Sequence, residues 1–163
     1  MRKKYRPPAP TYTMMHELMA STTEPLHESK RRHQLSRMYE GLATIERGAE
    51  PSPQDWRMCA DAVNLLETMI EEMKIAEDKE GLLPEAIQAM GEAGERHRLG
   101  GTIRLSGRGI FVIRSILEDY AALIDVLPAR TVIRAHRLTE ARLRQILAGR
   151  GRLHPGTKVI DLC

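Results

Sequence analysis

Apolar residues recur every three or four positions in several stretches of the chain, which is the spacing of one face of an α-helix. The first stretch covers residues 28–47, and Gly48 follows where a helix C-cap is expected. Ser52 and Pro53 are typical start signals for a second helix. Its apolar seam consists of Trp56, Cys59, Val63, Leu66, Ile70 and Met73. The seam predicts about five turns, with an end near Gly81.

A third helix is expected to open at Pro84, and Gly91 and Gly94 predict that it is short and partly exposed, because glycine is a weak helix former. Residues 100–105 predict a loop. Ser106 predicts the N-cap of a fourth helix that lasts until Pro128.

Thr131 predicts the N-cap of a fifth helix that ends near Gly149. The prolines of residues 1–27 predict an extended basic arm, although a short apolar stretch in it has the spacing of one or two helical turns and is expected to dock on the core. That stretch is Met14, Met15, Leu18 and Met19. The expected architecture is therefore an all-α, compact bundle of about five helices in residues 28–149, with the arm before it and an extended basic-apolar tail in residues 150–163.

Composition narrows the class of protein without naming a function. Hydrophobic residues make up 42% of the 163 positions and charged residues 29%, which favours one folded domain over a disordered chain. No apolar run approaches the roughly 20 residues of a membrane span. Prolines follow the basic start where a signal peptide needs an apolar run, and two cysteines, Cys59 and Cys163, do not make a disulfide framework. A cytoplasmic setting is expected.

Charge is unevenly distributed along the chain although the net charge is only +3. Residues 1–40 carry eight Lys/Arg and four Asp/Glu, residues 128–163 carry eight and two, and the middle is acidic. On a helical wheel, four arginines of the fifth helix share an arc of about 80°: Arg130, Arg134, Arg137 and Arg144. We call these four the arginine ridge.

Arg150 and Arg152 extend the arginine ridge into the tail, and Lys3, Lys4 and Arg6 form a second basic group together with residues 30–32. The interpretations left open are a solvated surface, a nucleic-acid backbone and an acidic protein patch. For the arm, a mobile terminus that binds nothing is the favoured interpretation.

No motif predicts catalysis, a metal site or a cofactor. Cys59 belongs to an apolar seam, no serine lies in a nucleophile turn, and the six histidines lack the spacing of metal ligands. His136 is expected to be a partly buried packing residue. The protein is therefore predicted not to be an enzyme and to hold neither metal nor cofactor.

Several segments together resemble a family of short, uncharacterised proteins encoded by phages and prophages of Gram-negative bacteria. The resemblance covers most of residues 3–148, and its segments are Lys4-Tyr5-Arg6-Pro7, Pro53-Gln54-Asp55-Trp56, residues 62–67, Leu105-Ser106-Gly107 and Ala122-Leu123-Ile124-Asp125. The chain departs from the family in residues 29–33 and after Gly149.

This resemblance and the polarised charge favour a non-enzymatic accessory protein that binds and modulates or inhibits a host macromolecule. A nucleic-acid-processing or antiphage defence complex is the expected partner, in an anti-CRISPR-like manner. The alternative is a DNA-binding transcriptional regulator that uses the basic helix 131–148 and the N-terminal arm. The seam of the second helix is either a homodimer surface or, more simply, part of the core.

Overall fold

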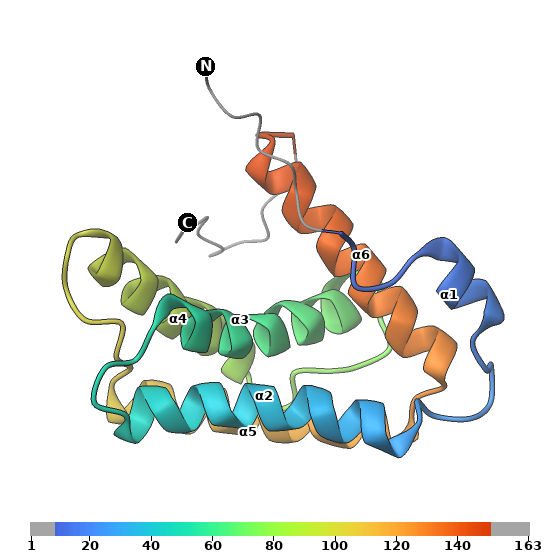
Figure 1. Ribbon diagram of the computed structural model, residues 1–163, viewed down its shortest axis with the longest axis horizontal. Coiled ribbons are helices and arrows are strands. Elements are labelled where there is room, and N and C mark those ends of the chain that lie inside the picture. Colours follow the sequence, from blue (N-terminus) through green and yellow to red (C-terminus); the bar gives the residue numbers. More distant parts are fainter. Residues whose placement is uncertain (1–8, 151–163) are drawn as a thin grey trace.

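The computed structural model describes residues 9–150, and every regular element in that range is a helix (Figure 1). The elements are α1 (Met14–Met19), α2 (Glu28–Arg47), α3 (Pro53–Glu67), the π-helix η1 (Thr68–Glu72), α4 (Leu82–Arg98), α5 (Gly107–Val126) and α6 (Ala129–Leu147). The predicted all-α class is confirmed, and α1 joins the five expected helices. Residues 1–8 of the predicted arm and 151–163 of the predicted tail lie outside the described range. Within residues 9–150, no helix has both the length and the apolar character needed to cross a bilayer.

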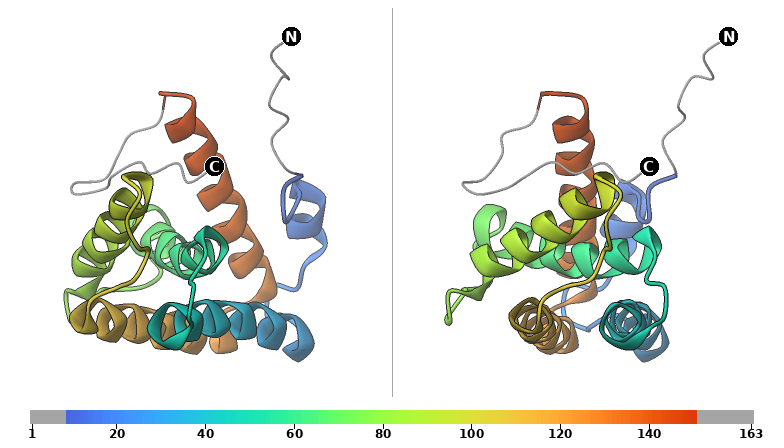
Figure 2. Two further views of the ribbon diagram at one scale, coloured as in Figure 1. Left: turned by 60° about the vertical axis from the view of Figure 1, so that its left-hand side comes forward. Right: turned by 90° about the vertical axis from the view of Figure 1, so that its left-hand side faces the viewer.

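Helices α2 and α5 lie side by side and form one layer, which the end-on view of Figure 2 shows clearly. Helices α3 and α4 pack on this layer, and α6 rises away from it with α1 along its side. The side chains between the layers are almost all aliphatic, and they include Leu42, Ile45, Leu66, Ile113, Ile116 and Leu117. The apolar faces read from the sequence therefore build one continuous core.

The close approach of α2 and α3 depends on Gly41. A Cβ atom at this position would lie 2.8 Å from the carbonyl oxygen of Asp55 and 2.9 Å from the Cβ of Met58. Both neighbours are fixed by α3, whose first turn is closed by a capping box between Ser52 and Asp55. The glycine is therefore required by helix packing.

The second predicted helix ends earlier than expected. Its α-helical part stops at Glu67, η1 follows, and residues 73–81 are not helical, whereas a single helix to Gly81 was predicted. The hydroxyl of Thr68 donates to the carbonyl oxygen of Asn64 at 3.0 Å and accepts from the Thr139 hydroxyl at 2.7 Å. Tertiary contacts at Thr68 thus coincide with the change of helix type.

Asp78, one of the acidic residues after η1, caps the start of α4. The Asp78 carboxylate accepts hydrogen bonds from the backbone N–H groups of Leu82 and Leu83 at 2.9 and 3.0 Å. Gly81, with φ of 66°, precedes α4 and does not close the helix before it. An acid in this position is favourable, because a helix N-terminus carries a partial positive charge.

Helix α4 runs for 17 residues, so the prediction of a short helix is wrong. Gly91 and Gly94 are both buried in it. Burial of this face against neighbouring helices outweighs the low intrinsic propensity of glycine. Trp56 adds an anchor from α3, because its indole N–H donates to the Met90 carbonyl oxygen at 2.9 Å.

Helix α6 begins at Ala129 with Pro128 as its N-cap residue, three residues before the predicted N-cap Thr131. Its first backbone N–H groups find acceptors in the segment before α2. Ala129 donates to the Glu24 carbonyl at 2.8 Å and Arg130 to the Ser21 carbonyl at 2.9 Å. A distant segment therefore replaces the expected side-chain cap. The predicted cap of α5 is confirmed, since the Ser106 hydroxyl accepts from the Gly109 N–H at 3.0 Å.

A buried ion pair joins α6 to the end of α3. The Arg142 guanidinium lies 2.8 Å from Glu67 Oε2, and the two side chains are only 8% and 3% exposed. Arg142 also donates to the Asn64 carbonyl at 3.2 Å, and its Nε lies 3.4 Å from Glu72 Oε1. Because the interior disfavours isolated charge, these groups hold each other in place.

The contact at Gly41 predicts that alanine destabilises the protein at this position more than at an exposed glycine. We expect G41A to lower the free energy of unfolding by about 1–3 kcal/mol, since the new methyl group meets backbone that cannot move freely. G107A is the matched control, because nothing lies within 4 Å of a Cβ built there, and we expect it to be neutral or slightly stabilising. Urea unfolding measures both. Equal stability of G41A and the wild type would contradict the close packing of α2 and α3.

Candidate functional site

A pocket of about 440 Å³ lies among α2, α3, α6 and the segment that precedes α1. Its polar and charged lining comes from Lys30, His33, Gln34, Arg37, Asp61, His136, Thr139 and Glu140. Its apolar lining comes from Tyr12, Met38, Met58, Leu65 and Leu143. A volume of this size is typical of small-molecule sites.

A neutral hydrogen-bonded group forms part of the pocket wall. The Gln34 side-chain amide donates to the Tyr120 hydroxyl at 2.6 Å and lies 2.8 Å from His136 Nε2. Burial lowers the pKa of His136 to about 4, so its imidazole is neutral near pH 7. A neutral Nε2 accepts the amide hydrogen, which leaves the proton of the ring on Nδ1. His136 was expected to be a packing residue, and in the structure it also accepts a hydrogen bond from Gln34.

The segment before α1 closes one side of the pocket. The Thr11 backbone N–H donates to Glu140 Oε1 at 3.0 Å. The ring of Tyr12 meets the His136 ring edge-on, with their centroids 5.2 Å apart. This segment therefore fixes a carboxylate and a ring of α6 in their positions.

Charges of both signs line the pocket from different helices. Lys30, His33 and Arg37 lie on one face of α2, while Asp61 comes from α3 and Glu140 from α6. In residues 9–150, none of the side chains of Lys30, His33, Arg37 and Asp61 forms a hydrogen bond or a close ion pair. The pocket thus presents separated charges to whatever enters it.

Asp61 has the most perturbed carboxyl group of the pocket. Desolvation by the surrounding protein raises its pKa to about 6, and Glu140 adds to this, while Arg37 and Arg57 act in the opposite direction. The side chain still faces the solvent of the pocket, so its desolvation is partial. Such a shift is typical of functional carboxylates but also occurs in structural clusters.

The four residues of the arginine ridge have different surroundings in the structure. Arg130 donates to the backbone carbonyls of Leu18 and Ala20 at 2.7 and 3.3 Å, and Arg137 pairs with Glu17. These two arginines hold α1 against α6 and do not face outward as the helical wheel predicted. The other two lie on the exposed side, where Arg144 is 3.8 Å from Glu140. Arg134 has no side-chain partner among the described residues, and Arg150 is exposed at the end of that range.

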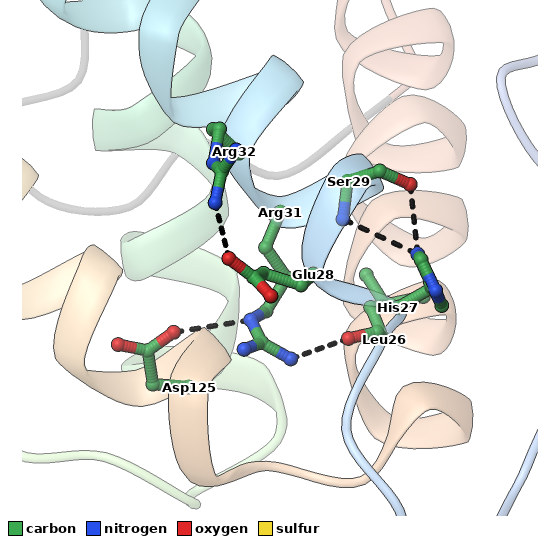
Figure 3. Close-up of polar contacts among 7 residues, drawn as sticks. All are labelled: Leu26, His27, Glu28, Ser29, Arg31, Arg32 and Asp125. Atoms are coloured by element: carbon green, nitrogen blue, oxygen red, sulfur yellow. Dashed lines mark hydrogen bonds and ion pairs between the residues drawn. The ribbon is translucent and has the colours of Figure 1, made fainter.

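The residues of the second basic group also have different surroundings, and Figure 3 shows those of Arg31 and Arg32. Arg31 lies 3.1 Å from the Asp125 carboxylate of α5 and donates to the Leu26 carbonyl, and Arg32 pairs with Glu28 one turn away. Lys30 belongs instead to the pocket. Lys3, Lys4, Arg6 and Arg152 lie outside the described residues, so their predicted role in binding stays a prediction.

Helix α1 exposes most of its apolar side chains. Met14, Met15, Leu18 and Met19 are between 53% and 79% exposed, although this stretch was expected to dock its apolar residues on the core. The helix does contact α6, but its attachment is polar and uses the arginines described above. A fixed methionine-rich surface results.

Little in the described residues suits nucleophilic or metal chemistry. Cys59 is fully buried, and burial raises the pKa of its thiol to about 12, so it is not a nucleophile at neutral pH. Between residues 9 and 150, no group of three or more His, Cys, Asp or Glu side chains is placed to hold a metal ion.

Sequence reasoning missed the pocket because its residues come from segments far apart in the chain. The three-, four- and seven-residue spacings among Lys30, His33 and Arg37 were a usable signal for one polar helix face. Nothing local connects that face with Asp61 or Glu140, which the helix packing brings to it.

Comparisons of this chain with known protein families, with curated proteins and with solved structures find no match.

The raised pKa of Asp61 predicts how stability depends on pH. The unfolded chain releases this proton near pH 4, but the folded protein holds it until about pH 6, so the Asp61 contribution to stability falls as pH rises across that window. We expect D61N to be more stable than the wild type at pH 7.5, with the difference shrinking towards pH 4. His136 titrates with the opposite sign but is present in both proteins.

Thermal unfolding of D61N and the wild type across this pH range measures the difference directly. If D61N is less stable than the wild type at pH 7.5, the Asp61 carboxylate stabilises the folded protein, and the prediction is contradicted.

Proposed function

We propose that this protein is a non-enzymatic, phage-type accessory protein that binds a host macromolecule and modulates or inhibits it. A nucleic-acid-processing or antiphage defence complex is the partner that we favour. The phage-family resemblance of the sequence supports the origin, and the uneven charge of the chain supports oriented association with a partner.

The observation that supports this proposal most is the exposed face of α1. Large apolar patches on a protein surface mark interaction sites, and methionine is common in adaptable ones because its side chain is flexible and polarisable. Here the apolar side chains lie on a helix that Arg130 and Arg137 already hold in place. A pre-ordered helix loses less entropy on binding than a free one, so α1 is suited to enter an apolar groove of a partner.

The alternative is a DNA-binding regulator, and the exposed side of α6 is the feature that favours it. Arg134 and Arg144 remain on that side, and Arg150 is exposed just after the end of α6. Two of the four ridge arginines bind α1, however, and this reduces the cationic surface that a phosphate backbone could contact.

The α1 surface yields a matched test of the proposal. We expect M15Q/M19Q to keep the stability of the wild type, because both side chains are exposed, and to lose partner binding. L99Q is the control, since Leu99 is as exposed but lies at the end of α4. Each protein is used to capture partners from a Gram-negative host lysate, and the captured protein is purified and titrated by calorimetry.

The proposal predicts a saturable interaction that M15Q/M19Q weakens at least about tenfold and L99Q does not change. Equal affinity of all three proteins would rule out the α1 surface. A parallel titration with nonspecific duplex DNA over a series of salt concentrations tests the alternative, a DNA-binding regulator. Binding that falls steeply with salt and is lost in R134A/R144A would favour the regulator.

A further inference from the structure

The pocket between α2, α3 and α6 has a charge pattern that the proposed function does not use. Its α2 wall carries Lys30 and Arg37, and the opposing helices supply Asp61 and Glu140. Opposite charges within reach usually form an ion pair, yet neither Lys30 nor Arg37 is paired with a described carboxylate. Arg37 acts on Asp61 only through its longer-range field.

The carboxylate side of the pocket is held in position before any ligand arrives. Glu140 accepts the hydrogen bond from the Thr11 backbone at 3.0 Å and has the Arg144 guanidinium 3.8 Å away. Asp61 is on the rigid helix α3 and is ionised at neutral pH. Two carboxylates from different helices that are close enough to affect each other form a natural site for one cationic group.

The remaining lining suits the carbon skeleton and the neutral polar atoms of a small molecule. Tyr12, Met58 and Leu143 supply apolar surface. Gln34 and the neutral His136 supply hydrogen-bonding groups without adding charge. Because Lys30 and Arg37 are positive and Asp61 and Glu140 are negative, a ligand with charged groups of only one sign would leave part of the pocket uncompensated.

We propose that this pocket binds a small zwitterionic molecule, which carries an ammonium or guanidinium group near a carboxylate or phosphate group. Asp61 and Glu140 receive the cation, and Lys30 and Arg37 receive the anion. The exposed side chains of α1 do not line this pocket, so substitutions can be made in either surface without changing the residues of the other.

The test is an NMR titration of the full chain at neutral pH with L-arginine, L-lysine and phosphoethanolamine, each alone. We expect at least one of them to shift the pocket signals of Gln34 and His136 saturably, with Kd below about 1 mM. D61N and R37Q should each weaken that binding about tenfold, the size expected for one charge-assisted contact. R47Q is the control, because Arg47 is on α2 but outside the pocket.

For L-arginine, agmatine is the matched probe, since it keeps the guanidinium group and lacks the carboxylate. If L-arginine binds, agmatine should bind more weakly and should be insensitive to R37Q. The proposal is overturned if none of the three molecules shifts the pocket signals at about 10 mM, a concentration that would reveal even a millimolar Kd. It is also overturned if D61N and R37Q bind as tightly as R47Q.

Discussion

The buried ion pair between Arg142 and Glu67 is the contact on which the arrangement of this protein depends. It joins α6 to the end of α3, at the point where the α-helix changes into η1. A buried charge is stabilised by opposite charge and by hydrogen bonds. Here Asn64 accepts a hydrogen bond from Arg142, while the buried Nε of Arg142 makes no hydrogen bond within residues 9–150 and lies 3.4 Å from Glu72 Oε1. The hydroxyl contact between Thr139 and Thr68 joins α6 to the first residue of η1 and makes this a polar junction in an otherwise apolar core.

Both proposed binding surfaces depend on the position of α6. The helix supplies His136 and Glu140 to the pocket, and its arginines Arg130 and Arg137 hold α1. A shift of α6 relative to α3 would therefore open the pocket and move the methionine-rich helix at the same time. The hydrophobic core includes the first half of α6 through Val132, Ile133 and Ala135. The later turns of α6 attach to the end of α3 and to η1 through the polar contacts of Thr139 and Arg142.

Local signals in the sequence were sufficient for much of the helical framework. The caps at Ser52 and Ser106 and the boundaries of α2 and α5 were predicted, because they depend on residues close together in the chain. Errors arose where distant residues decide the outcome. The start of α6 depends on carbonyls of Ser21 and Glu24, and the length of α4 depends on the burial of its glycines.

For the candidate sites too, local patterns were predicted from the sequence and contacts between distant residues were not. Helical periodicity placed the ridge arginines in one arc of α6, but it could not show that Arg130 and Arg137 bind α1. Arg142 was not singled out, because a lone arginine on an apolar helix face has no local pattern that distinguishes it. The pocket was not predicted, since its charged residues meet only after three helices have packed.

Native-state hydrogen exchange of the α6 amides in R142M and in E67L/R142M tests this account most directly. Removal of one partner of a buried pair leaves an uncompensated charge, so we predict that α6 in R142M loses about 3–5 kcal/mol of protection. Removal of both charges in E67L/R142M should restore most of it. Unchanged protection of α6 in R142M would contradict the central role of this ion pair.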